Sequence, residues 1–269
     1  MSDEQRVTVE VTDGVADVRL ARPDKRNALD PAMFEGLVHT GERLKADRSV
    51  RVVVLSGEGP DFCAGLDFGS FRAMASGERL SASAQLPDTD GPARATGQRA
   101  AWVWAELPVP VIAAIRGNAL GGGLQIALGA DIRIVAPDAR LSVLEAKWGL
   151  IPDMTGTQVL PELVGRDVAK ELTLTGRFVS GTEAAALGLC TRTDDDPVGA
   201  ALELARGIAG RSPHAVRAAK RLLDLAGRVD LATGFAAEQE EIGALIGSPN
   251  QVEAVTAGFE KRDPVFRDA

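Results

Sequence analysis

The chain has no tyrosine, two histidines and two cysteines, and aromatic residues make up 4% of it. Aromatic side chains are the platforms on which nucleic-acid bases stack, so their scarcity argues against such a surface. With so little histidine, a His-based catalytic triad or a metal site is a poor explanation of function. Cys63 and Cys190 lie far apart without CxxC spacing, which favours free thiols over a disulfide.

Long apolar runs are missing too, since none approaches the roughly 18 residues that a membrane span needs. The N-terminus, MSDEQR, is polar and lacks the apolar centre of a secretory signal. Asp plus Glu (38) exceed Lys plus Arg (30), and a net charge of -8 disfavours nucleic-acid binding, RNA included. We therefore expect a cytoplasmic protein with neither a membrane nor a nucleic acid as partner.

What remains is the composition of an ordinary globular protein, 45% hydrophobic and 25% charged. Apolar strands alternate with helical segments as far as about residue 179, and helical patterns dominate after it. We predict the α/β class, with a core over residues 1–195 and a helical region over residues 196–269.

Local patterns place several elements. Residues 6–10 and 15–20 alternate polar and apolar side chains around an Asp-Gly pair, which predicts a hairpin. Asp30 before Pro31 predicts the start of a helix. Further expected elements are a strand at 52–55, a strand pair formed by 132–135 and 140–143, and helices that open at Ser180, Asp196 and Ser212. The helix after Ser212 has an apolar face that packs either on its own core or on a neighbouring subunit.

Residues 112–131, IAAIRGNALGGGLQIALGAD, read as strand, tight turn and buried helix. Consecutive glycines at a helix start leave backbone N–H groups open to an oxygen that becomes negative during a reaction. The alternative is that they only permit close packing. Phosphate-binding readings are weak, because no Walker motif is present and Ile126 occupies the third glycine position of GxGxxG.

The same device, an apolar strand running into a glycine-rich loop, precedes Ala64 in residues 56–68. Two such loops can face one pocket, with amides of Gly122 and Ala64 converging on one carbonyl oxygen. Residues 74–97 are rich in Ser, Ala, Gly, Asp and Pro and lack apolar periodicity, which predicts a mobile segment of functional importance.

Two carboxylates follow the central stretch. Glu145 comes after an apolar strand, and Asp153 lies in a loop bounded by proline and glycine. Carboxylates beside apolar surface have raised pKa values and can exchange protons near neutral pH. A solvated carboxylate is the plainer alternative, and Lys147 is a specific rival partner for Glu145.

Five segments in order resemble the crotonase superfamily, the enoyl-CoA hydratase/isomerase family. They are RPDKRNALD, VVVLSGEGPDFCAGLD, PVIAAIRGNALGGGLQIALGADIRI, GLIPDMTGTQVLPELVG and LTGRFVSGTEAAALGL. The resemblance implies a spiral of ββα units followed by a helical trimerisation region, assembled as a homotrimer or a dimer of trimers. It also implies an acyl-coenzyme A thioester as substrate, so that coenzyme A is part of the substrate and neither a cofactor nor a metal is needed.

By matching positions, the resemblance assigns the amides of Ala64 and Gly122 to an oxyanion hole for the thioester oxygen. It assigns coenzyme A or substrate binding to Lys25, Arg26, Ala28, Leu66, Asp67, Phe68 and Gln125, and a neighbour's coenzyme A to Phe259 and Lys261. The acyl group is expected to be selected by the segment 74–97.

The residues at three positions, taken together, distinguish hydratases from isomerases of the family, and they favour one reaction for this chain. Family hydratases carry a glutamate at the position of Gln125 and another at Glu145, whereas dienoyl-CoA isomerases use a glutamate at Glu145 and an aspartate eight residues later, at Asp153. Those isomerases also tend to have an acid where Gln125 stands, and simple enoyl-CoA isomerases keep only the glutamate at Glu145. We predict an isomerase of 3,5-dienoyl-CoA or 3-enoyl-CoA in fatty-acid degradation, with Glu145 and Asp153 as acid/base groups; the alternatives are an enoyl-CoA hydratase and a non-catalytic acyl-CoA binder.

Overall fold

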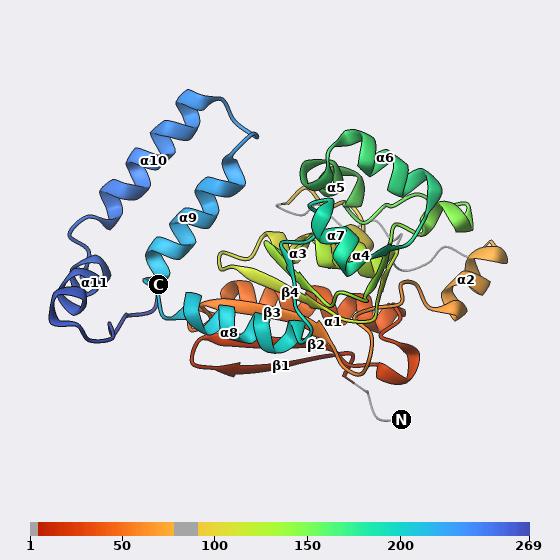
Figure 1. The fold of residues 1–269 in the computed structure, drawn as a ribbon, viewed down its shortest axis with the longest axis horizontal. Helices are drawn as coiled ribbons and strands as arrows, with labels where there is room; N and C mark the ends of the chain where they lie inside the picture. The colour runs from red at the N-terminus through yellow and green to blue at the C-terminus, as the bar shows by residue number, and fades with distance from the viewer. Residues whose placement is uncertain (1–4, 78–90) are drawn as a thin grey trace.

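The computed structural model describes residues 5–77 and 91–269. It confirms the α/β class, with two sheets among helices (Figure 1). Residues 78–90, which belong to the segment 74–97 predicted to be mobile, lie outside the described residues. Among the described residues, none of the helices is long and apolar enough to cross a membrane.

The larger sheet holds the strands in the order β1-β2-β3-β4-β6-β9. Their bounds are Val7–Thr12, Val15–Leu20, Val52–Gly57, Val111–Ile115, Ile132–Val135 and Arg192–Thr193. The predicted hairpin is confirmed, since β1 and β2 pair antiparallel, and every other pairing in this sheet is parallel. β3 and β4 are buried along their whole length, which explains their continuous apolar sequence.

The smaller sheet has the order β5-β7-β8, formed by Asn118–Leu120, Arg140–Ser142 and Val179–Ser180. The predicted strand pair of 132–135 with 140–143 is wrong. β6 joins the larger sheet beside β4, whereas β7 pairs in parallel with β5. The Pro-Asp turn between them therefore carries the chain from one sheet to the other.

The described helices are α1 (Pro31–Ala46), α2 (Phe68–Ala75), α3 (Thr96–Ala105), α4 (Gly122–Leu128), α5 (Gly156–Val164), α6 (Arg166–Thr175), α7 (Gly181–Ala186), α8 (Pro197–Ala209), α9 (Pro213–Leu225), α10 (Leu231–Leu245) and α11 (Pro249–Glu260), with 3-10 turns η1 (Pro23–Lys25) and η3 (Glu145–Trp148). The predicted starts are confirmed at three caps. The side chains of Asp30, Ser180 and Asp196 each accept a backbone N–H from the first turn of their helix.

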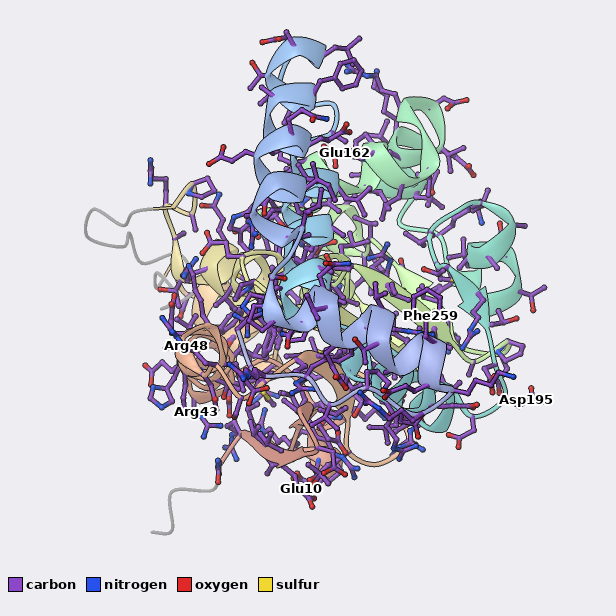
Figure 2. All side chains as sticks on the ribbon, turned by 90° about the vertical axis from the view of Figure 1, so that its left-hand side faces the viewer. Glu10, Arg43, Arg48, Glu162, Asp195 and Phe259 are labelled. Atoms are coloured by element: carbon purple, nitrogen blue, oxygen red, sulfur yellow. The ribbon has the colours of Figure 1, made fainter. Side chains whose placement is uncertain are left out.

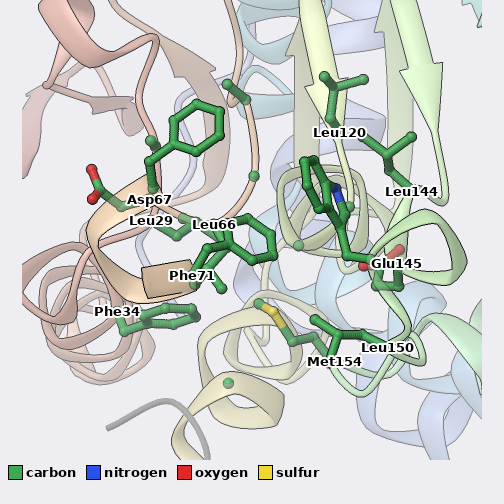
Figure 3. Close-up of a pocket in the computed structure, with 18 of the residues that line it drawn as sticks. Leu29, Phe34, Leu66, Asp67, Phe71, Leu120, Leu144, Glu145, Leu150 and Met154 are labelled. Carbon is green, nitrogen blue, oxygen red and sulfur yellow. The ribbon is translucent and has the colours of Figure 1, made fainter. Parts of the chain in front are cut away.

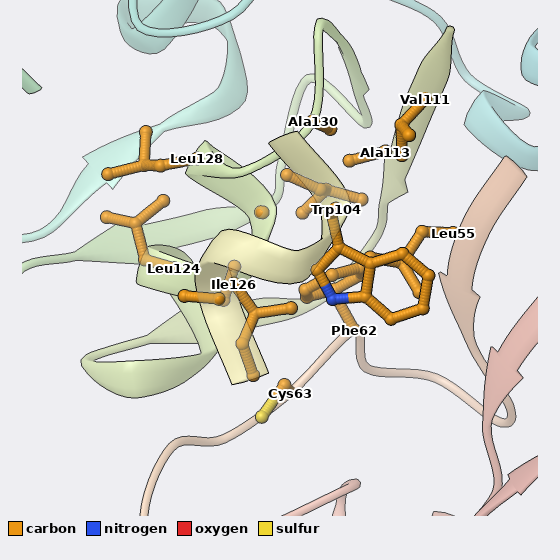
Figure 4. Packing of buried hydrophobic residues seen from close by; sticks show 14 of the residues in the cluster. Leu55, Phe62, Cys63, Trp104, Val111, Ala113, Leu124, Ile126, Leu128 and Ala130 are labelled. Carbon is orange, nitrogen blue, oxygen red and sulfur yellow. The ribbon is translucent and has the colours of Figure 1, made fainter. Parts of the chain in front are cut away.

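Two apolar cores lie on opposite faces of the larger sheet. The first holds apolar residues of α1, α3 and α4. Figure 4 shows part of it, with Trp104 and Phe62 among Leu124, Ile126 and Leu128 of α4. The second is covered by α8, whose Ala201, Ala205 and Ala209 recur every four residues and bring the helix close to the sheet. α8, the first helix of the region predicted as helical over residues 196–269, therefore packs on the larger sheet.

The chain then leaves the core as α9, α10 and α11 (Figure 1). α9 is tied to the core near its middle by Lys220, whose Nζ donates to Asp131 Oδ2 at 2.7 Å and to the Val109 carbonyl at 3.1 Å. Large apolar side chains on these helices face solvent, among them Leu223, Leu231, Phe235 and Ile246. The face predicted after Ser212 is therefore not fully covered by this chain's own core.

Candidate active site

A cavity of about 770 Å³ opens where the two glycine-rich loops meet (Figure 3). Its walls come from η1 and the residues after it, the loop after β3, α2, the start of α4, and η3 with the loop that follows. Of the residues predicted for the site, Lys25, Arg26, Ala28, Ala64, Leu66, Asp67, Phe68, Gly122, Glu145 and Asp153 all line it.

The two loops are joined by backbone hydrogen bonds. Cys63 N donates to the Asn118 carbonyl at 2.9 Å, and Leu120 N donates to the Cys63 carbonyl at 3.0 Å. Gly65, with a φ of +86°, passes so close that a Cβ there would lie 2.7 Å from the Leu120 carbonyl oxygen. The expectation that both loops face one pocket is confirmed.

Three consecutive glycines at the start of α4 have three different structural roles. Gly121 turns the chain at a φ of +51°. Gly122 is the first helical residue, so its amide has no acceptor within the helix. Gly123 packs against the other loop, because a Cβ there would lie 2.6 Å from the Cys63 carbonyl oxygen. Close packing and an open amide therefore coexist, on neighbouring residues.

The amide of Ala64 is already engaged. It donates to the carbonyl of Arg26 at 2.9 Å, within the wall that carries Lys25 and Arg26. An oxygen bound between Ala64 and Gly122 must therefore share this bond or replace it. The amide of Gly122, which has no acceptor within its helix, can donate to such an oxygen without giving up another hydrogen bond.

Gln125 and Glu145 form a buried pair beneath the pocket. Gln125 Nε2 donates to Glu145 Oε1 at 2.6 Å, and the residues are 1% and 8% exposed. Gln125 Oε1 accepts the backbone N–H groups of Met154 at 2.9 Å and of Gly156 at 3.0 Å. Glu145 Oε2 is buried and has no hydrogen-bond partner among the described residues. Gln125 itself lies behind the cavity wall.

Both candidate acids have raised pKa values. Burial raises the pKa of Glu145 above its ordinary value, the hydrogen bond from Gln125 acts against this rise, and the charge of Asp153 adds to it. Burial also raises the pKa of Asp153, although that residue stays exposed at the cavity. The rival partner of Glu145, Lys147, has its Nζ over the Trp148 ring, 5.6 Å from its centroid. Both carboxylates therefore bind a proton more readily than ordinary carboxylates, which suits groups that exchange protons with a substrate.

The opposite side of the cavity carries three cations, Arg22, Lys25 and Arg26, together with the carboxylates of Asp24 and Asp67. Lys25 and Arg26 are exposed, while Arg22 donates to Asp67 Oδ2 at 2.7 Å. Burial acts to raise the pKa of Asp67, but the bonds from Arg22 and from Gly69 N lower it below the ordinary value. Exposed cations on a wall of backbone groups suit a phosphorylated ligand.

The remaining walls are apolar. Phe34, Phe71, Leu150 and Met154 surround the space next to Glu145 (Figure 3). The rings of Phe71 and Trp148 lie 4.9 Å apart between centroids. Carboxylates at the end of an apolar space suit a hydrocarbon group with one reacting region.

Phe259 and Lys261 do not line this cavity. Phe259 lies on α11 (Figure 2), is 84% exposed, and belongs to the helices that leave the core at the end opposite α2 (Figure 1). In a single chain they are therefore far from the site.

Sequence reasoning missed residues that hold the site in shape. Asn27, at a φ of +55°, is fully buried and donates to the carbonyls of Glu58 and Asp61, which ties the basic wall to the loop before Ala64. Asparagine is one of the few residues that tolerate this conformation, but sequence alone does not show that it is adopted. The apolar walls, Phe34, Phe71 and Met154, were missed because they carry no polar signal.

Comparison with known proteins gives one consistent result. The family model described as enoyl-CoA hydratase/isomerase matches residues 10–269. The mouse protein named mitochondrial methylglutaconyl-CoA hydratase is 35% identical over 261 residues, which cover 94% of this chain and 80% of that protein. The human protein named mitochondrial enoyl-CoA hydratase domain-containing protein 2 is 36% identical over 260 residues, covering 94% of this chain and 85% of that one.

Solved structures agree. The crystal structure of an enoyl-CoA hydratase from Bacillus anthracis superimposes with a TM-score of 0.84 at 33% identity, covering 97% of this chain and 99% of that one. The enoyl-CoA hydratase from Mycobacterium tuberculosis H37Rv gives a TM-score of 0.85 at 30% identity, covering 99% of this chain and all (100%) of that one.

Proposed function

The chain belongs to the enoyl-CoA hydratase/isomerase family and acts on coenzyme A thioesters, and from this premise we propose that it moves a double bond in an enoyl- or dienoyl-CoA. The observation that carries the proposal is the set of groups beside the Gly122 amide. Two carboxylates with raised pKa values, Glu145 and Asp153, line the cavity, and the third polar side chain, Gln125, has no proton to exchange.

The proposed reaction begins at the thioester. Its oxygen accepts hydrogen bonds from Gly122 N and, once the bond to the Arg26 carbonyl has been exchanged, from Ala64 N. Glu145 removes a proton from the carbon chain, and the electron pair moves toward the thioester oxygen as an enolate. One oxyanion-hole donor typically contributes about 3 to 4 kcal/mol to such a step.

Asp153 then delivers a proton to a distant carbon, and the electron pair returns to form the shifted double bond. The charge of Asp153 acts on Glu145, so the two carboxylates are electrostatically coupled across the cavity. One proton is taken by Glu145 and one is given by Asp153, so the isomerisation consumes no water and no cofactor. Proton exchange with solvent then returns Glu145 to its ionised form and Asp153 to its protonated form.

The residues that line the cavity indicate where the coenzyme A and acyl parts of the substrate would bind. The exposed Lys25 and Arg26 would bind the coenzyme A phosphates, and backbone groups of residues 25–28 and 66–68 would hold its chain. Among the described lining residues, the cations are Arg22, Lys25 and Arg26, all on this side. The acyl end holds Glu145 and Asp153 and is otherwise apolar, so we propose an uncharged hydrocarbon acyl group.

A relative named methylglutaconyl-CoA hydratase bears on this choice, because a glutaconyl group carries a free carboxylate in addition to the thioester. Near Glu145 and Asp153 that group would meet like charge. The acyl group proposed here therefore differs from the one in that relative's name.

We also propose that a second copy of this chain covers α9–α11, giving a homotrimer or a dimer of trimers. Leu231 and Phe259 are 75% and 84% exposed, and Ile246 is 70% exposed, on helices of one region. Large apolar side chains exposed together in one region of a protein are typical of an interaction surface. In such an assembly, Phe259 and Lys261 would reach the coenzyme A of a neighbouring subunit.

The test offers the purified protein a 3,5-dienoyl-CoA, a 3-enoyl-CoA and a 2-enoyl-CoA and follows the ultraviolet absorbance of each. Conversion of the first or second substrate to its conjugated isomer supports the proposal. Fast hydration of the 2-enoyl-CoA without isomerisation refutes it and establishes the second candidate, a hydratase, which the names of several relatives favour. Tight binding without exchange of the α-proton for solvent deuterium would leave a non-catalytic acyl-CoA binder.

A further inference from the structure

The side-chain amide of Gln125 is fixed in one orientation. Its Oε1 accepts two backbone N–H groups, those of Met154 and Gly156. If the amide were flipped, an NH₂ group would face these two donors and neither would have an acceptor. Nε2 must therefore point at Glu145, where it donates to Oε1 at 2.6 Å.

The backbone closes around this pair on both sides. A Cβ at Gly156 would lie 2.8 Å from Gln125 Oε1, and a Cβ at Gly121 would lie 3.3 Å from Glu145 Oε1. A residue larger than glycine at either position would press on the pair, so the two glycines allow the backbone to approach it this closely. One oxygen of Glu145 is thus held, while the other, Oε2, is buried and has no partner among the described residues.

We propose that Gln125 is a positioning residue that holds Glu145 through Oε1 and so leaves Oε2 as the single oxygen of Glu145 that takes the substrate proton. This inference rests on the proposed role of Glu145 as the base. The amide donates a hydrogen bond and accepts no proton, so it favours the carboxylate form of Glu145 and no proton is shared between two acids.

The other charged groups around Glu145 are few. Asp153 faces it and raises its pKa. α4 and β5 carry no ionisable side chain, and Lys147, on the same 3-10 turn, has its Nζ over the Trp148 ring. α6 packs against η3, and its ionisable residues are Arg166, Asp167, Lys170 and Glu171, all exposed. The donor from Gln125 is therefore the buried polar contact that a substitution can change selectively.

The experiment compares Gln125→Glu and Gln125→Met by the pH dependence of kcat/KM for isomerisation. Gln125→Glu keeps an acceptor for Met154 N and Gly156 N but places an oxygen where Nε2 faced Glu145. We expect the acid limb of the profile to move up by about one pH unit or more, since a proton must now be shared, with KM changed less than about twofold. Gln125→Met removes the donor and the acceptor together, and we expect kcat to fall at least about tenfold.

Gln158→Glu is the matched control, because Gln158 is exposed on α5 and the substitution makes the same change of charge nearby. Its profile should overlay that of the unchanged protein. A Gln125→Glu acid limb within about 0.3 unit of the unchanged protein's, with equal kcat, overturns the inference. The Gln125→Glu profile tests the inference by itself, even where the Gln125→Met variant fails to fold.

Failure of the inference and failure of the proposed function are separable. Retained turnover in Glu145→Gln would reject Glu145 as the base and the proposed function with it. Loss of turnover in Glu145→Gln together with an unchanged Gln125→Glu profile would reject only the role given to Gln125.

Discussion

Glu145→Gln is the most discriminating perturbation of this site, because it removes a proton acceptor and almost nothing else. The new amide has the shape of the carboxylate, and its oxygen can accept the hydrogen bond that Gln125 Nε2 donates at 2.6 Å. General acid–base catalysis contributes about 10²- to 10⁴-fold, so kcat for isomerisation should fall by that factor, about 3 to 5 kcal/mol of barrier. The affinity for a non-reactive acyl-CoA analogue should be unchanged, since the wall proposed to bind coenzyme A, with Lys25 and Arg26, is on the opposite side of the cavity.

The same substitution makes a prediction about stability. Burial raises the pKa of Glu145 above its ordinary 4.5, so the folded protein retains a proton that the unfolded chain releases. The stability linked to this proton is fully present below pH 4.5 and is lost as the pH rises through the raised pKa. Glutamine does not ionise, so the free energy of unfolding of the variant, relative to the unchanged protein, should increase as the pH rises from 4.5 through the raised pKa of Glu145.

Kinetics are followed by the ultraviolet absorbance of the conjugated product and stability by urea unfolding at several pH values. Glu203→Gln, an exposed position on α8, is the control and should change neither. Turnover within about threefold of the unchanged enzyme would refute the role of Glu145. A stability difference independent of pH would refute the account of its burial.

Three further outcomes are expected. Asp153→Asn should slow isomerisation by about 10²-fold yet keep the exchange of the α-proton for solvent deuterium, which mass spectrometry of the recovered substrate measures; loss of exchange would contradict a role confined to proton delivery. Gly123→Ala should lower the free energy of unfolding by about 1 to 3 kcal/mol, because its Cβ would lie 2.6 Å from the Cys63 carbonyl oxygen, whereas Gly207→Ala on α8, with open space, should be neutral or stabilising in the same thermal melts. A dicarboxylic acyl-CoA should have a kcat/KM roughly 100-fold below that of its methyl ester, since like charges about 6 Å apart at an effective dielectric of about 20 repel by about 3 kcal/mol; equal values would show that a cation reaches the acyl group.

Sequence predicted best what is decided locally. The caps at Asp30, Ser180 and Asp196 are set by residues within one helical turn, and each is present. Strand partners depend on the whole chain, so the pairing of 132–135 with 140–143 was wrong, and β9, two residues long, gave no signal.

In the site, too, features set by single residues or short motifs could be predicted, and contacts between distant segments could not. The glycine turn and the two carboxylates could be predicted because their residue types carry the chemistry. The bond from Ala64 N to the Arg26 carbonyl and the two backbone donors on Gln125 could not, since each joins segments distant in sequence. The sequence singled out Gln125 because family hydratases have a glutamate at its position. Its hydrogen bonds to Glu145 and to the Met154 and Gly156 amides support the positioning role proposed above.

The exposure of α10 has a consequence for how the protein responds to dilution. None of the side chains of this 15-residue helix is buried by the described residues. Helices shorter than about 12 to 15 residues are marginal in water, and α10 stands at the upper end of that range. Its backbone amides should therefore exchange with deuterium quickly in a separate chain and slowly in the assembly proposed above, while the amides of β3 and β4 stay protected at every concentration.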